Sequence, residues 1–217
     1  MKDLKFKITE GREYRNVQKL EARALDNEKT RETVEGYATV FDEPYTLWEE
    51  DDYVVREVVD KGAFNDTDMN DVIMQYNHEG RVFARTRNNT LDLAVDENGL
   101  HIRADLSGTD IGRELYQEIA GGYTDKMSFG FTVRGDEVTE ERAEGEKTII
   151  TRRITDIGKL YDVSAVSFPA NDATSITARS FADGLIGKAK AERLKAEAIE
   201  NKRLQLEERI KLLTGKE

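Results

Sequence analysis

Hydrophobic and polar residues alternate over short stretches through much of the chain, and turn-forming residues separate these stretches. Alternation with a period of two is typical of β-strands that bury one face. The pattern predicts strands at residues 36–41, 54–59, 72–76, 91–95, 100–106, 126–134, 148–154 and 160–168. Asn98-Gly99 favours a tight turn, so the fourth and fifth of these strands should form a hairpin. Residues 1–32 predict only a short strand at 5–8, and 136–147 reads as a charged connection.

A helix is predicted between the fifth and sixth strands. Ile111, Leu115 and Ile119 recur at intervals of four residues, which places them on one helical face. Thr109 or Asp110 can cap the start, and the two glycines at 121–122 end the helix.

From about Ala182 onward the residues are strong helix formers and proline is absent. A narrow apolar stripe that includes Ile199, Leu206 and Ile210 predicts a projecting helix or a short coiled coil outside the main core. Two glycines, Gly184 and Gly187, predict a hinge before this helix.

The order of these elements predicts an α+β fold. We expect a closed or nearly closed, mainly antiparallel β-barrel with surrounding helices, plus a C-terminal helical extension. The chain of 217 residues divides into a partly irregular N-terminal segment at 1–32, a domain at 33–181 and a helical tail at 182–217.

Composition excludes several classes of function. The net charge of −11 argues against nucleic acid as a partner, because phosphate binding needs clustered Lys and Arg. The absence of cysteine excludes disulfides, a thiol nucleophile and thiolate metal sites. With no secretory h-region and no apolar stretch of membrane-spanning length, we expect a soluble protein without a membrane partner. No nucleotide-binding glycine motif or metal-ligand spacing occurs, so no cofactor or metal is expected.

Three polar residues on or beside predicted strands are candidates for catalysis. His78 ends the strand at 72–76, Ser128 lies within the strand at 126–134, and Asp162 lies within an apolar strand. A serine hydroxyl becomes nucleophilic when a base removes its proton, and a carboxylate can orient that base. Each residue also has a structural interpretation: His78 as a surface histidine, Ser128 as a small polar residue on a half-exposed face, and Asp162 as an ion-pair partner of Arg152 or Arg153. The second histidine, His101, lies inside a strand, where a structural role is expected.

Strand alternation indicates which way Ser128 points. Met127, Phe129 and Phe131 share the core face, so Ser128 is turned toward the opposite face. Gly130, two residues on, predicts room there for an approaching peptide.

Five short blocks along the chain resemble the tailed-phage prohead protease family. They are Gly-Tyr-Ala-Thr-Val-Phe at 36–41, Gly-Ala-Phe at 62–64, Tyr-Asn-His at 76–78, Met-Ser-Phe-Gly-Phe at 127–131 and Asp-Val-Ser-Ala-Val-Ser-Phe-Pro-Ala-Asn at 162–171. The blocks occur in the family's order and cover roughly residues 34–179. The resemblance implies a serine endopeptidase related in fold to the herpesvirus assembly protease, with its protease domain at 33–181.

The resemblance also implies residue roles. It makes Ser128 the nucleophile, His78 the general base and Asp162 the third member of the triad. The family commonly has Glu at the third position, so Asp162 departs from its pattern by one methylene group.

The function that the resemblance implies is capsid maturation inside the phage prohead, within the host bacterial cytoplasm. The enzyme would remove the scaffolding segment of the major capsid protein and cleave itself, with the portal and a second copy of the chain as further partners. We hypothesise that the helical tail docks onto the scaffold segment. The alternatives are a non-catalytic capsid-assembly protein on the same fold and an esterase that uses the same three residues.

Overall fold

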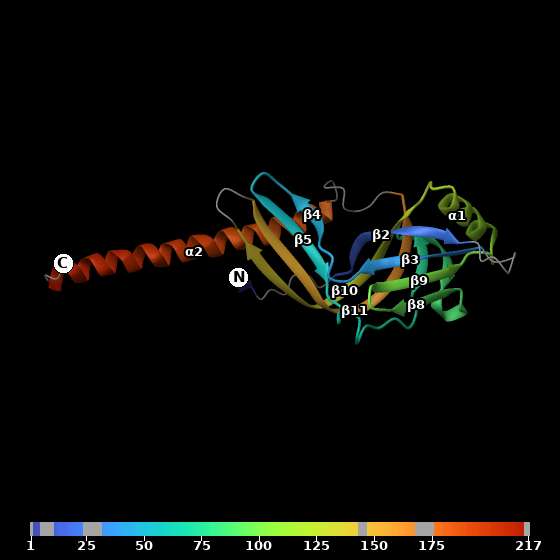
Figure 1. Cartoon of the computed structure of the whole chain (residues 1–217), viewed down its shortest axis with the longest axis horizontal. Helices are drawn as coiled ribbons and strands as arrows, with labels where there is room; N and C mark the ends of the chain where they lie inside the picture. Colours follow the sequence, from blue (N-terminus) through green and yellow to red (C-terminus); the bar gives the residue numbers. More distant parts are fainter. Residues whose placement is uncertain (1, 5–10, 24–31, 143–146, 168–175, 215–217) are drawn as a thin grey trace.

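The computed structural model describes residues 2–4, 11–23, 32–142, 147–167 and 176–214. Its strands and helices, in chain order, are β1 (Lys2–Leu4), β2 (Glu13–Arg23), β3 (Thr33–Val40), β4 (Tyr45–Glu49), β5 (Tyr53–Val59), β6 (Ile73–Tyr76), β7 (Glu79–Arg85), the 3-10 helix η1 (Thr86–Asn88), β8 (Leu91–Val95), β9 (Gly99–Asp105), α1 (Asp110–Ala120), β10 (Lys126–Glu141), β11 (Thr148–Val166) and α2 (Ile176–Thr214). The mixed α+β composition and the C-terminal helix agree with the sequence pattern (Figure 1).

The strands form one eleven-stranded sheet with the order β4-β5-β11-β10-β2-β3-β9-β8. Three strands lie off this path: β1 pairs with β10, β6 pairs with β11, and β7 pairs with β6. Only β5 and β6 run parallel to their neighbour β11; the other named pairings are antiparallel. Across the described residues the path stays open between β4 and β8, so the expected closed barrel is not found.

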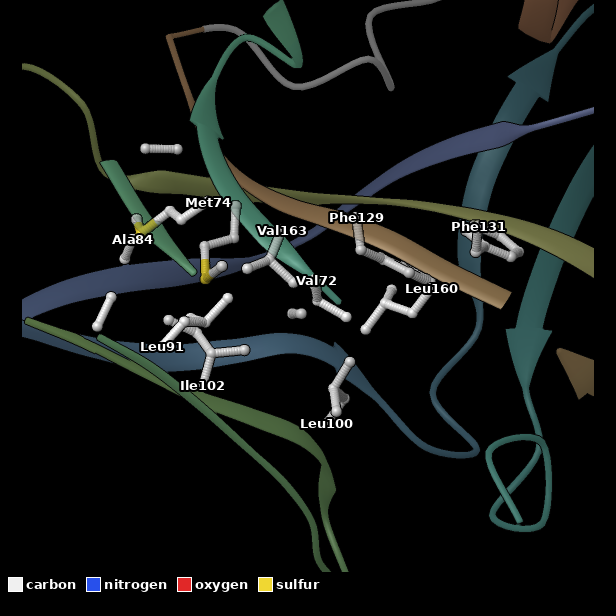
Figure 2. Packing of buried hydrophobic residues seen from close by; sticks show 14 of the residues in the cluster. Val72, Met74, Ala84, Leu91, Leu100, Ile102, Phe129, Phe131, Leu160 and Val163 are labelled. Atoms are coloured by element: carbon white, nitrogen blue, oxygen red, sulfur yellow. The ribbon is translucent and has the colours of Figure 1, made fainter. Parts of the chain in front are cut away.

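The sheet curls so that β3, β8 and β9 face β6, β10 and β11 across a hydrophobic core. Figure 2 shows this packing, with labelled residues including Leu91, Leu100 and Ile102 on one side and Met74, Phe129 and Val163 on the other. Met127, Phe129 and Phe131 are all fully buried, as the alternation along β10 predicts. Because this packing decides which side chains of β10 and β11 point into the core, it also decides which side chains lie on the opposite face of the two strands.

A second, smaller core joins α2 to the sheet. Ala182, Leu185, Ile186 and Ala189 pack with Leu47 and Val55 of β4 and β5. Beyond this contact α2 projects away from the sheet (Figure 1). The helix runs without a break through Gly184 and Gly187, so the predicted hinge is wrong: the packed residues on either side hold this segment helical.

Several elements differ from the sequence-based expectation. The hairpin at 91–105 and the helix capped by Thr109 are confirmed. The strands expected at 148–154 and 160–168 form one strand, β11, and β10 extends through half of the expected charged connection to Glu141. The strand expected at 5–8 lies outside the described residues.

The N-terminal segment contains β2, an 11-residue strand where little regular structure was expected. It pairs with both β10 and β3, so residues 13–23 belong to the sheet. The division of the chain at 33 and 182 stays a prediction.

Candidate active site

Three adjacent strands bring the candidate catalytic residues together. In the antiparallel pair β10–β11, Ser128 lies opposite Ser164 and Gly130 lies opposite Asp162. On the other side of β11, the parallel strand β6 places Ile73 opposite Asp162. Residues two apart on a strand point to the same face, so Ser128 and Asp162 lie on one face of neighbouring strands.

His78 reaches this face from a tight turn. Tyr76 of β6 pairs with Glu79 of β7, which leaves a two-residue turn made of Asn77 and His78. Both have positive φ, 50° and 61°, as a type I′ turn requires. Such a backbone is uncommon for histidine, and it persists where the surroundings determine it.

Contacts from the end of β11 hold that turn. The Asn77 backbone N–H donates to the Ala165 carbonyl at 2.9 Å, and the Asn77 Oδ1 accepts from the Ser167 N–H at 3.2 Å. The turn is thereby fixed to the strand that carries Asp162.

The side chain of His78 bridges the other two candidates. Its Nδ1 lies 2.6 Å from Asp162 Oδ1, and its Nε2 lies 2.5 Å from Ser128 Oγ. An ionised carboxylate can only accept a hydrogen bond, so Nδ1 carries the proton and donates to Asp162. In that tautomer Nε2 has a free lone pair and accepts from the Ser128 hydroxyl. The geometry is that of a nucleophile, a base and an orienting carboxylate.

Asp162 is fully buried, and three described groups surround its carboxylate. Oδ1 accepts from His78 and from the Ser164 hydroxyl at 2.8 Å. Oδ2 forms an ion pair with the Arg12 guanidinium. The ion pairs that Asp162 forms with described residues are with Arg12 and His78, and not with Arg152 or Arg153 as in the alternative interpretation.

Those two arginines lie in other clusters. Arg152 pairs with Glu13, Glu57 and Asp136, and Arg153 with Asp42 and Asp60.

Gly130 does not leave room for a peptide, as was expected, but leaves room for two neighbouring side chains. A Cβ at this position would lie 2.5 Å from Asp162 Oδ2 and 2.9 Å from both Nε and Nη2 of Arg12. The space beside Ser128 is therefore occupied by the Arg12–Asp162 ion pair, and it is not an open path for a peptide.

Ser128 has no exposed surface, so its assignment to a half-exposed face is wrong. It does point away from the hydrophobic core, but the opposite face is covered. His78 lies over its hydroxyl, and the Tyr14 ring packs on the imidazole with a centroid distance of 4.2 Å.

The environment of His78 keeps it neutral. Burial, and after it the positive charge of Arg12, together lower the pKa of His78 from 6.5 to about 4. At neutral pH the imidazole is therefore unprotonated and free to accept a proton from Ser128.

The second histidine is not part of this cluster. His101 packs edge-on against Tyr37 at a ring-centroid distance of 5.1 Å. Within the described part of the chain, no group of three or more His, Cys, Asp or Glu side chains has an arrangement that could hold a metal ion. No helix among the described residues is long and apolar enough to cross a membrane.

Sequence patterns missed three residues of this site: Arg12, Tyr14 and Ser164. Arg12 lies directly before β2 and Tyr14 lies on it, and the described side chains on the buried face of β2, Glu13 and Arg15, are charged rather than hydrophobic. A search for apolar alternation does not detect such a strand. A signal does exist for Ser164, which lies two residues after Asp162 and so shares its face of the strand.

Comparison with known proteins identifies the family of this chain. Residues 18–185 match the family model described as caudovirus prohead serine protease. The prohead protease of Enterobacteria phage HK97 is 31% identical over 156 residues, covering 70% of this chain. The chain spans 61% of the length of that relative.

Among solved structures, the bacteriophage T4 capsid assembly protease matches with 13% identity and a TM-score of 0.39. That match covers 73% of this chain and 98% of the T4 chain, but the similarity is too low to support an argument. The extent of the family match, by contrast, decides membership. This chain belongs to the caudovirus prohead serine protease family.

Proposed function

We propose that this protein is a serine endopeptidase of phage capsid maturation, with Ser128 as nucleophile, His78 as general base and Asp162 as the orienting carboxylate. The observation that carries the proposal is the pair of contacts made by one imidazole, 2.5 Å to Ser128 Oγ and 2.6 Å to Asp162 Oδ1. The family membership supports the same reaction class.

The reaction begins when His78 Nε2 removes the proton from Ser128 Oγ as the oxygen attacks the peptide carbonyl carbon. The resulting imidazolium is stabilised by the Asp162 carboxylate. His78 then gives the proton to the leaving amine, the C–N bond breaks, and an acyl-enzyme ester remains on Ser128. Water, activated by His78, hydrolyses this ester and restores the serine.

Burial of Ser128 adds a condition to this mechanism. Its side chain has no exposed surface in the present arrangement. An extended peptide therefore reaches Oγ only after a covering group moves aside. A resting site that is covered suits a protease that must stay inactive until its substrates have assembled around it.

We propose that the substrates are the scaffolding segment of the major capsid protein and the protease itself, inside the prohead. The HK97 relative is named a prohead protease, which supports this choice.

The outer part of α2 supplies a candidate contact with the capsid protein. Ile199 and Leu206, which are 69% and 53% exposed, lie seven residues apart and therefore share one face of this projecting helix. We propose that this surface binds the helical scaffold segment and brings the enzyme into the shell.

The function is tested by co-expression with the major capsid protein of the same phage. The unmodified chain should shorten the capsid protein, and Ser128→Ala should leave it at full length. Ser107→Ala is the matched control, because Ser107 lies in the loop before α1 and its hydroxyl donates to Asp105 rather than to a residue of the site. Capsid protein shortened equally by Ser128→Ala would refute the assignment, and assembly without any cleavage by the unmodified chain would favour a non-catalytic assembly protein.

A further inference from the structure

Arg12 lies before the start of β2, outside the matched family region, and yet it contacts the centre of the proposed site. Its guanidinium forms an ion pair with Asp162 Oδ2, the oxygen that faces away from His78. Asp162 is fully buried, and a buried carboxylate without a counter-charge is strongly destabilising. Arg12 supplies that counter-charge.

Two aromatic rings hold the guanidinium in place. Its central carbon lies 4.6 Å from the centroid of the Tyr161 ring and 5.1 Å from that of the Tyr14 ring. Both distances are within the range of cation–π attraction. Tyr14 also packs on His78, so one side chain contacts both Arg12 and the catalytic imidazole.

The backbone that carries Arg12 is anchored from the opposite face of β2. Glu13 and Arg15 point into a buried ion-pair cluster, where Arg15 Nε bonds to Glu57 at 2.5 Å and Arg152 bonds to Glu13 at 2.7 Å. Because neighbouring residues on a strand point to opposite faces, this anchoring turns Arg12 and Tyr14 toward the site.

The absence of a side chain at Gly130 completes the arrangement. Any Cβ there would overlap Asp162 Oδ2 and crowd two nitrogens of Arg12, at 2.5 Å and 2.9 Å. The ion pair between Arg12 and Asp162 therefore requires glycine at position 130 of β10.

We infer that Arg12 is a positioning residue of the catalytic triad: it holds the Asp162 carboxylate so that Oδ1 points at His78 Nδ1. Because the triad roles belong to the proposed function, this inference rests on it. Without Arg12, the described contacts that fix the rotation of the carboxylate are the two hydrogen bonds on Oδ1, and the His78 hydrogen bond loosens. Arg12 does not touch the reacting atoms; it acts through Asp162.

The test uses the imidazole itself, because the chain contains only two histidines. In ¹⁵N-histidine-labelled full-length protein, the unmodified chain should show a low-field Nδ1–H proton for His78, with His101 as the internal control. In Arg12→Ala this resonance should be lost and the His78 pKa should rise above its value of about 4. Among the described residues, the charged or titratable groups that face His78 are Asp162 from β11, Tyr14 from β2 and Arg12 just before β2, so few groups can cause a shift in the His78 pKa.

Companion variants separate positioning from a general loss of structure. Arg12→Lys keeps the charge and should retain the resonance in weakened form, and added guanidinium ion should restore it in Arg12→Ala. Arg209→Ala, on the exposed end of α2, should leave His78 unchanged. The labelling rate of Ser128 by a small fluorophosphonate should fall by about 10- to 100-fold in Arg12→Ala, as for other misplacements of about 1 Å.

The outcomes are distinct. An unchanged low-field resonance and pKa in a folded Arg12→Ala protein would overturn the positioning role. If Arg12→Ala does not fold, the Nδ1–H signal of His78 and the labelling rate of Ser128 are measured in Arg12→Lys instead. A signal and a rate that equal those of the unmodified protein would then overturn the positioning role. Failure of the unmodified protein to cleave capsid protein or to label at Ser128 would instead overturn the proposed function, and the imidazole measurements do not depend on that activity.

Discussion

His78 Nε2 lies 2.5 Å from Ser128 Oγ, although 50 residues separate them in the chain. Neither residue's strand pairs with the other's; both β6 and β10 pair with β11, from opposite sides. The contact exists because the turn after β6 carries the imidazole across the end of β11 to the strand beyond it. The distance between His78 and Ser128 thus depends on the position of β11 between the two strands.

Replacing His78, the proposed general base, should abolish activity with little effect on the fold. His78→Gln cannot accept the Ser128 proton, and we expect capsid-protein cleavage to fall by at least ~10³-fold, as for other triad bases. His101→Gln is the matched control, since it removes the other histidine and should cleave at the unmodified rate. Equal loss in both variants would point to a structural effect.

Activity should persist to unusually low pH. The pKa of His78 is lowered from 6.5 to about 4 by burial and by the Arg12 charge. The base works only when neutral, so the rate should hold down to about pH 5 and fall as pH drops through about 4. The measurement is the pH profile of fluorophosphonate labelling at Ser128. An acidic limb near 6.5 would contradict the assignment.

The same depressed pKa makes stability depend on pH. Between about pH 4 and 6.5 the unfolded chain binds a proton at His78 that the folded chain does not. This contribution to stability is therefore fully present above 6.5 and is lost as pH falls through about 4. Urea unfolding of the unmodified protein and of His78→Gln should show a smaller slope against pH in the variant over this range. Parallel slopes would mean that the imidazole titrates alike in both states.

Gly130→Ala should inactivate the enzyme through the Arg12–Asp162 ion pair. The added Cβ would lie 2.5 Å from Asp162 Oδ2, so the carboxylate must move, and we expect destabilisation of about 1–3 kcal/mol together with loss of labelling at Ser128. Gly135→Ala on the same strand is the control, because its nearest contacts are at 3.2 Å to the side chains of Asp156 and Thr155. Labelling of Gly130→Ala at the rate of the control would argue against the space requirement.

Two neighbouring arginines should differ sharply in their effect on stability. Arg152 is fully buried and pairs with Glu13, Glu57 and Asp136, so Arg152→Met removes a cation that compensates these buried carboxylates and should destabilise by about 3–5 kcal/mol. The side chain of Arg153 is 38% exposed, and Arg153→Met should cost about 1 kcal/mol or less. Urea unfolding measures both, and similar values for the two would contradict a structural role for the buried cluster.

Removal of the outer part of α2 should uncouple capsid entry from catalysis. Deleting residues 194–217 keeps the packed segment around Leu185 and Ile186 and the Arg193–Glu140 ion pair. We expect normal labelling at Ser128 but loss of the protease from proheads, measured by its amount in purified particles.

A substitution pair on the full-length chain refines this prediction. Replacing Ile199 and Leu206 with Ser should reproduce the loss, whereas replacing Lys195 and Lys202, which also lie seven residues apart, with Ser should not. Normal incorporation of the truncated chain would show that the tail is dispensable.

Much of the core and part of the site could be predicted from the sequence. The alternation along 126–134 identified the core face of β10, and Thr109 identified the start of α1. Hydrophobic alternation did not predict the strands β4 and β7, because most of their residues are partly or fully exposed and neither strand has a continuous buried apolar face. β2 was missed for a related reason: its buried face carries ion pairs, and hydrophobic periodicity cannot detect it.

The sequence by itself determined which residues were eligible for catalysis, because residue chemistry, strand period and the family blocks are all local properties. Only the tertiary structure decided how they meet: it placed β11 between β6 and β10, turned His78 onto Ser128, and brought Arg12 onto Asp162 across 150 residues of chain. The physical reason is that pairing between distant strands and the neutralisation of a buried charge depend on the whole fold. No local pattern records which cation will reach a given carboxylate.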